Sequence, residues 1–230
     1  MTDDSSEEKQ TPVPLSAAAR RVLAVLVEKA KTTPDSYPLS LAGVISGSNQ
    51  KSNRSPKMDL DEDDAVVALD ELRELGAARE IQGSGRVLKY RHAAYEWLDV
   101  DSPQSAVMTE LLLRGPQTLG EIRTRASRMY KLDDLNAAKT VVLSLVEKGL
   151  VEAVTPAGRG QMFTHTLYQP DERQYLGLRL EKQAADKPKP DPNVNRNAVD
   201  QLLARLETVT ERIDSLEQRI GELEGPNSES

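Results

Sequence analysis

The sequence predicts a mainly helical chain in which a unit of three helices and a β-hairpin occurs twice and is followed by a coiled coil. Three observations lead to this fold class. Apolar residues recur at helical spacing between capping residues, the order of elements repeats along the chain, and apolar residues near the C-terminus follow alternating steps of three and four. Aromatic residues make up only 3% of the chain, so we expect an aliphatic core.

The first unit begins with a helix that Ser16 caps and that runs to about Lys31. Ser40 starts a short second helix, because a serine side chain accepts hydrogen bonds from the exposed amides of a first turn. A third helix begins near Asp61 and ends at Gly76, which tolerates the left-handed conformation. The expected buried positions are Val22, Leu23, Leu26, Val27, Leu41, Val44, Ile45, Ala65, Leu69, Leu72 and Leu75.

A β-hairpin is expected next, with strands over residues 78–81 and 86–91 and a turn at Gly83-Ser84-Gly85. Three helices closed by a hairpin, or wing, follow the plan of a winged-helix domain.

The second unit follows the same order. Ser102-Pro103 opens its first helix, Thr118 and Glu121 form a capping box for the second, and Asp133 caps the third, which ends at Gly149. Hairpin strands are expected over residues 151–155 and 159–168. On the third helix, the positions expected to face the core are Ala138, Val142, Leu145 and Val146.

The two units match residue by residue, which makes the repeat the strongest signal in the chain. One constant shift pairs Leu69 with Val142, Gly76 with Gly149, and Gly85-Arg86 with Gly158-Arg159. The starts of the second helices need a larger shift, so the first unit carries about five additional residues within the segment 49–58. Extra length in a loop of a compact scaffold is where function often lies.

The C-terminal seam predicts a coiled coil of four heptads. β-Branched residues lie mostly at its a positions and leucines mostly at its d positions, which favours two parallel strands. Arg212 and Arg219 are then placed to pair with Glu217 and Glu224 of a second copy, although a trimer stays open. The expected dimerisation residues are Val199, Leu202, Leu206, Val209, Ile213, Leu216, Ile220 and Leu223.

The sequence thus divides into six segments. We expect a disordered tail (1–14), winged-helix domain 1 (15–99), winged-helix domain 2 (100–183), a Pro-rich linker (184–197), a parallel coiled coil (198–224) and a second tail (225–230). Trp97 lies between the two units, where we expect it to pack rather than to bind a ligand.

The residue inventory gives little support to enzymatic chemistry. The chain has no cysteine, which excludes disulfides, thiolate metal sites and cysteine nucleophiles. It has no glycine-rich phosphate loop and no zinc motif, and His92 and His165 are expected at separate surface strand positions rather than in a catalytic pair. We therefore predict a non-enzymatic protein with no catalytic residue, metal or cofactor. The lack of a signal peptide or membrane-spanning stretch favours the cytoplasm.

The charge distribution argues against a DNA contact of the usual kind. The net charge is −7, but residues 15–183 hold 23 basic and 23 acidic residues, so the acidity lies in the tails. In an ordinary winged helix the third helix enters the major groove. Here that helix begins Asp61-Glu62-Asp63-Asp64, and four carboxylates would repel phosphate.

Binding residues are therefore expected elsewhere, on the segment 49–58, after the wing turns and on the second helix of the second unit. The candidates for binding nucleic acid or a partner are Asn49, Gln50, Lys51, Asn53, Arg54, Lys57, Arg86, Lys89, Arg123, Arg125, Arg128 and Arg159. Asn49, Gln50, Asn53 and Arg54 have side chains that suit reading of base edges, but they equally suit capping the end of the second helix and holding an irregular loop, and they could also dock a protein. Two hypotheses stay open: a dimer that binds nucleic acid such as DNA, as a transcription regulator does, and an adapter that docks a basic protein.

Two stretches resemble the YceH family of bacterial proteins. The first lies within residues 27–60 and contains Tyr37-Pro38-Leu39-Ser40-Leu41, Asn49-Gln50-Lys51 and Asn53-Arg54. The second runs from Leu111-Leu112-Leu113-Arg114-Gly115 through Thr118 to residues 123–130. The resemblance implies a tandem winged-helix fold and no established activity. Ser48 stands where the family is expected to carry a cysteine, which argues against a thiol role.

Overall fold

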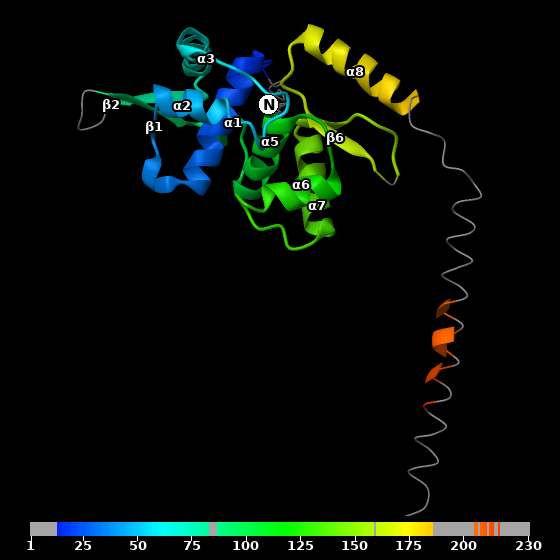
Figure 1. Ribbon diagram of the computed structural model, residues 1–230. Coiled ribbons are helices and arrows are strands. Elements are labelled where there is room, and N and C mark those ends of the chain that lie inside the picture. The colour runs from blue at the N-terminus through cyan, green and yellow to red at the C-terminus, as the bar shows by residue number, and fades with distance from the viewer. Residues whose placement is uncertain are drawn as a thin grey trace, which may run out of the picture. The chain divides into compact units, whose positions relative to one another are not determined.

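The computed structural model describes residues 13–82, 87–158 and 160–185, together with residues 205–206, 208–210, 212–213 and 216. The chain divides into two compact units, Met1–Leu180 and Glu181–Ser230. The first unit is mainly helical with two small antiparallel sheets, as the sequence predicts (Figure 1). The expected tail 1–14 (but for residues 13 and 14), most of the Pro-rich linker and the tail 225–230 lie outside the described residues.

The first repeat contains three helices and a three-stranded sheet in the order β1-β3-β2. Both strand pairs are antiparallel, with Leu39 opposite Tyr90 and Ala78 opposite His92. Its elements are α1 (Ala17–Thr32), the short 3-10 helix η1 (Pro34–Ser36), β1 (Leu39–Ser40), α2 (Leu41–Ser48), α3 (Glu62–Glu74), β2 (Ala78–Gln82) and β3 (Leu88–His92).

The second repeat has the same order, and its sheet runs β4-β6-β5. Its elements are α5 (Ser102–Arg114), β4 (Gln117–Thr118), α6 (Leu119–Ala126), α7 (Leu135–Glu147), β5 (Val151–Ala153) and β6 (Met162–His165). One short helix, α4 (Ala94–Trp97), connects the repeats, and α8 (Pro170–Ala185) follows the second.

Most of the predicted helix boundaries are confirmed. Ser16 and Ser40 cap α1 and α2, and the capping box of Thr118 and Glu121 is present. Two expected caps are wrong by one residue, because Asp101 rather than Ser102 caps α5 and Asp134 rather than Asp133 caps α7. In both cases the aspartate carboxylate accepts the amide of the third helical residue.

The sheets differ from the prediction in extent. β1 and β4 were not expected, because strands of two residues carry no alternation that a sequence pattern can reveal. The expected strand over residues 159–168 is shorter, since β6 covers only Met162–His165. On α7, Val146 was expected to face the core, but it is exposed, whereas Val142 and Leu145 are fully buried.

α1 and α5 form the centre of the unit and lie against each other (Figure 1). Each has ten consecutive buried residues, Ala19–Glu28 in α1 and Gln104–Leu113 in α5. A helix buried on every face must have neighbours all round. Each of these helices therefore packs on its own repeat and on the other helix, so the two repeats share one continuous core. Trp97 packs against that core, as expected.

α2 approaches α1 closely at Gly47. A Cβ atom at this position would lie 2.5 Å from Cγ1 of Val25, so only glycine fits without a shift of Val25 or of the backbone. This close approach fixes the start of the segment 49–58, which carries several of the predicted binding residues.

The expectation that both histidines lie on the surface is wrong. His165 is fully buried, and its Nδ1 accepts a hydrogen bond from the amide of Leu167 at 3.2 Å. His92 is half-buried beside Tyr37 and Tyr95, and its Nδ1 accepts from the amide of Ala94 at 3.3 Å. Each imidazole therefore stabilises the backbone just after the central strand of its sheet. Burial lowers the pKa of His92 to about 4 and lowers the pKa of His165 well below its usual range.

We predict that these histidines make stability depend on pH. The unfolded chain binds protons at both imidazoles near pH 6.5, whereas the folded chain does not, so the free energy of unfolding falls as the pH decreases from 6.5 towards 4. The loss for His92 is at most about 3 kcal/mol, from about 1.4 kcal/mol per pKa unit. Urea unfolding between pH 7.5 and 5 measures it. The double variant His92→Gln, His165→Gln should have a flatter profile, and an unchanged slope in that variant would contradict this assignment.

Candidate interaction site at the junction of the two repeats

Two glutamates lie inside the junction of the repeats. Glu28 on α1 and Glu110 on α5 each lie four residues before the last residue of their helix. Both are essentially inaccessible to solvent, with 1% and 0% of their surface exposed. A buried carboxylate destabilises a protein unless cations and hydrogen bonds compensate it, so the partners of these two residues decide whether the repeats can pack.

The segment 49–58 provides the main partner of Glu28. The guanidinium of Arg54 donates to both carboxylate oxygens, from Nη2 to Oε2 at 2.5 Å and from Nη1 to Oε1 at 3.2 Å. It also donates to the carbonyl of Gly47 and the side-chain oxygen of Gln50, both at 3.0 Å, and to the carbonyl of Asn53 at 2.9 Å. Because the Arg54 side chain is 0% exposed, it is part of the interior rather than of a binding surface.

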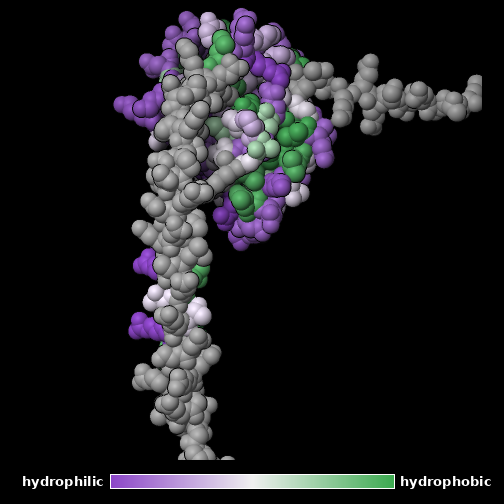
Figure 2. All heavy atoms as spheres, turned by 90° about the vertical axis from the view of Figure 1, so that its right-hand side faces the viewer, coloured by the Kyte–Doolittle hydropathy of each residue, from purple (hydrophilic) through white to green (hydrophobic). Residues whose placement is uncertain are grey.

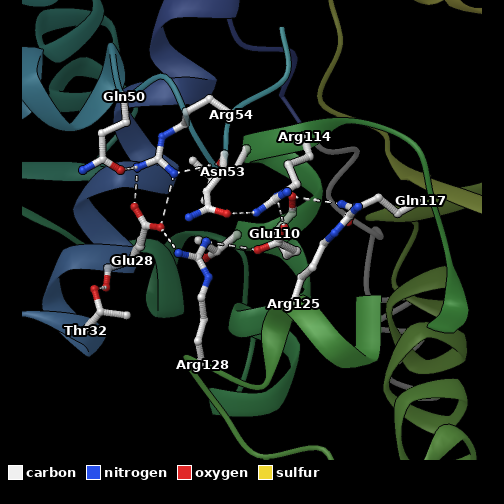
Figure 3. Close-up of polar contacts among 12 residues, drawn as sticks. Glu28, Thr32, Gln50, Asn53, Arg54, Glu110, Arg114, Gln117, Arg125 and Arg128 are labelled. Atoms are coloured by element: carbon white, nitrogen blue, oxygen red, sulfur yellow. Dashed lines mark hydrogen bonds and ion pairs between the residues drawn. The ribbon is translucent and has the colours of Figure 1, made fainter. Parts of the chain in front are cut away.

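The second repeat completes the network (Figure 3). Arg128, just after α6, donates to Oε1 of Glu28 and, at 3.1 Å, to Oε2 of Glu110, so it joins the two repeats. Arg114 lies 2.5 Å from Glu110, and it also donates to the side-chain oxygen of Asn53. Two buried carboxylates are thus held by three arginines, which come from the segment 49–58, α5 and the residues after α6.

The network keeps Glu28 ionised. Burial alone would raise the pKa of Glu28, but its hydrogen bonds and its attraction to Arg54 and then to Arg128 outweigh burial, so its pKa is lowered. The ion pairs therefore stabilise the fold above the usual glutamate pKa, and this stabilisation is lost as the pH falls below it.

The structure places most of the predicted binding residues in internal contacts. Asn49 exchanges two hydrogen bonds of 2.8 Å with the backbone of Leu60, so it fixes the path into α3. Gln50, Asn53, Arg54 and Arg128 belong to the network at the junction. These contacts agree with the alternative prediction, in which the polar residues hold an irregular loop.

The remaining candidates lie nearer the surface. Arg125 donates to Gln117 at 2.6 Å and pairs with Glu121, while Arg123 donates to the backbone carbonyl of Asp133. Lys51 and Lys57 are exposed, and Lys89 is half-buried on β3. Arg86 and Arg159 lie outside the described residues.

Sequence reasoning missed Glu28 and Glu110 as the centre of this site. The sequence of α1 does indicate this burial, because Glu28 directly follows the apolar run Val22-Leu23-Ala24-Val25-Leu26-Val27. That run is too continuous for a helix with one solvent-exposed face. Such a run predicts burial all round, and hence a buried glutamate that needs a cation.

The outer faces of the third helices differ in chemistry between the repeats. α3 exposes Glu62, Asp63, Asp64 and Asp70 together with Val66 and Val67. α7 exposes Leu135, Leu143 and Val146 at 50%, 44% and 38% of their surface. Figure 2 views the side of the second repeat and shows apolar side chains reaching the surface among polar ones.

Within the described ranges, no three histidine, aspartate or glutamate side chains are arranged to hold a metal ion. None of the helices in those ranges is long and apolar enough to cross a membrane.

The architecture defines a helix-rich protein built from two fused copies of one αβ unit. The chain belongs to the DUF480 family, described as "Protein of unknown function, DUF480", whose model matches residues 15–161.

Relatives carry the family name UPF0502 protein. One from Rhodopirellula baltica is 66% identical over 192 residues, covering 83% of this chain and 81% of the relative. A relative from Koribacter versatilis is 43% identical over 68% of this chain and 75% of the relative. A relative from Geotalea daltonii is 41% identical over 92% of this chain and 88% of the relative. These names state no activity, and none of them is YceH.

We predict that Glu28→Gln lowers the free energy of unfolding by roughly 3–5 kcal/mol, because it leaves the buried guanidinium of Arg54 without a carboxylate. The matched control is Glu121→Gln, which removes one charge from a half-exposed pair with Arg125 and preserves the capping box. It should cost less than about 1 kcal/mol. Urea unfolding at pH 7 measures both, and an equal cost for the two variants would refute the buried pair.

Proposed function

We propose that this chain is a non-enzymatic, cytoplasmic winged-helix adapter that docks other proteins through the outer faces of α3 and α7. The observation that carries the proposal is a largely apolar outer face of α7, where Leu135, Leu143 and Val146 are exposed with Lys139 among them. In a winged helix that binds DNA, the third helix faces the major groove. An apolar face suits a protein partner, because burying it there removes apolar surface from water.

The winged-helix assignment is supported by the order helix, strand, two helices and two strands, which occurs twice. In each repeat the short strand before the second helix pairs with the last strand, so the sheet closes beside the helices. The wings themselves are the hairpins β2–β3 and β5–β6.

The adapter hypothesis is favoured over nucleic-acid binding by how the predicted cations are used. Arg54 and Arg128 neutralise buried carboxylates, and Arg125 pairs with Glu121. The outer face of α3 is acidic and would repel phosphate. That face instead suits a partner rich in lysine and arginine. α3 and α7 lie at different ends of the folded part (Figure 1), so two partners can be bound together.

Photocrosslinking is our test of this proposal. A photoreactive amino acid at Val67 or Leu143 should give crosslinks to protein in cells, whereas the same group at the exposed strand residue Arg91 should not. Reversing the charge of Glu62, Asp63 and Asp64 should remove the Val67 crosslink and leave the Leu143 crosslink. Crosslinks that a nuclease destroys, or yields no higher than at Arg91, would overturn the proposal. A mixed-sequence duplex should show no salt-dependent binding in anisotropy.

We further propose that the chain forms a parallel homodimer through its C-terminal helix. Of the predicted seam, Val199, Leu202, Ile220 and Leu223 lie outside the described residues. The four described seam residues are helical, and each leaves about half of its surface exposed in a single chain; they are Leu206, Val209, Ile213 and Leu216. Such apolar residues at steps of three and four are what a second copy covers in a coiled coil.

Sedimentation equilibrium tests the dimer. The full chain should sediment at twice its 25.4 kDa mass, and a chain ending at Ala185 should be monomeric. Ile213→Lys should also give monomers, because it places a charge in the seam. Thr208→Lys adds the same charge at position c, away from the seam, and should stay dimeric. A dimeric Ile213→Lys variant would contradict this assignment, and a threefold mass would indicate a trimer.

A further inference from the structure

A cavity of about 290 Å³ lies where both repeats, the segment 49–58 and α8 meet. α1 and the end of α5 form its sides, residues 55–58 cross it, and the end of β6 and the first turns of α8 close it. Its volume is at the lower end of the range for small-molecule sites. The docking faces on α3 and α7 contribute no residue to it.

Arg21 gives this cavity an unbalanced positive charge. Its guanidinium is buried and donates only to backbone carbonyls, to Ser48 at 3.1 Å, Pro56 at 2.7 Å and Leu113 at 3.4 Å. Its Nε has no hydrogen-bond acceptor, and no ion pair joins Arg21 to a carboxylate among the described residues. Burial and the nearby charge of Arg54 lower the pKa of Arg21 to about 10, and the attraction of Glu28 offsets them only in part.

The other charged groups of the wall do not correct the imbalance. Arg20 is paired in two hydrogen bonds with Glu172 of α8, at 2.7 and 2.6 Å. Arg114 forms an ion pair with Glu110, and Glu110 forms a second ion pair with Arg128. The wall therefore contains three arginines and a single carboxylate. An excess of buried positive charge destabilises the protein unless an anion compensates it.

Apart from Ser55, the rest of the wall is apolar or aromatic. Side chains from four segments of the chain contribute, namely Ala17, Met58, Leu112, Pro116, Tyr175 and Leu176. Tyr175 is mostly exposed, so it stands at the mouth of the cavity. A cavity with cations on one wall and apolar side chains on another suits a molecule with both characters.

We infer that this cavity binds a small organic anion, a phosphate monoester or carboxylate with a short apolar chain. The charged group of this ligand lies toward Arg21 and Arg114, and its apolar tail packs on Leu112 and Leu176. Since the wall includes both repeats and α8, such a molecule would act as an effector that stabilises their arrangement.

Hexyl phosphate is the probe, titrated into the full chain by isothermal calorimetry. Inorganic phosphate carries the charge without the chain, and hexanol carries the chain without the charge. We expect hexyl phosphate to bind with a Kd of about 1 mM or lower, and each control at least about tenfold more weakly. Absence of binding, or equal binding of either control, would overturn the inference.

Two substitutions on α8 locate the site. Leu176→Trp fills the cavity and should abolish binding, whereas Leu178→Trp adds the same ring at an exposed position outside the wall and should not. Arg21→Met should remove the preference for hexyl phosphate over hexanol. If circular dichroism shows that Arg21→Met does not fold, the comparison of Leu176→Trp with Leu178→Trp is the test. Equal affinity of these two variants for hexyl phosphate would refute this cavity as the site.

Discussion

The ion pair between Glu28 and Arg54, extended by Arg128 to Glu110, is the interaction on which the arrangement of both repeats depends. α1 and α5 are apolar enough to pack on each other, but each brings a glutamate into the contact. Apolar packing alone would leave both carboxylates without solvent or cation. The arginines therefore allow these two helices to pack in one core with their glutamates buried.

This network also explains the extra residues of the first repeat. The segment 49–58 lets Arg54 reach back to α1 while Asn49 holds the entry to α3. Asn53 then contacts Arg114 of the other repeat, and the amide of Ser55 donates to the carbonyl of Leu113 at 2.9 Å. A loop that sequence reasoning expects to carry a binding surface thus forms the joint between repeats, and it leaves one wall of the cavity beside α8.

Sequence reasoning could predict the helices and the repeat because local rules determine them. Capping residues such as Ser16 and Thr118, and terminating glycines such as Gly76, act within one turn of the chain. It could not predict β1 and β4, which exist only because the last strand of each sheet lies beside them. Nor could it separate surface arginines from buried ones, since the burial of Arg54 depends on a glutamate 26 positions earlier.

Arg128 makes the two repeats depend on each other. Because one side chain satisfies a carboxylate in each repeat, neither repeat is complete as a separate domain. The first would keep Glu28 with Arg54 alone, and the second would expose the apolar side of α5. The two halves thus depend on each other as the subunits of an obligate dimer do, although both belong to one chain.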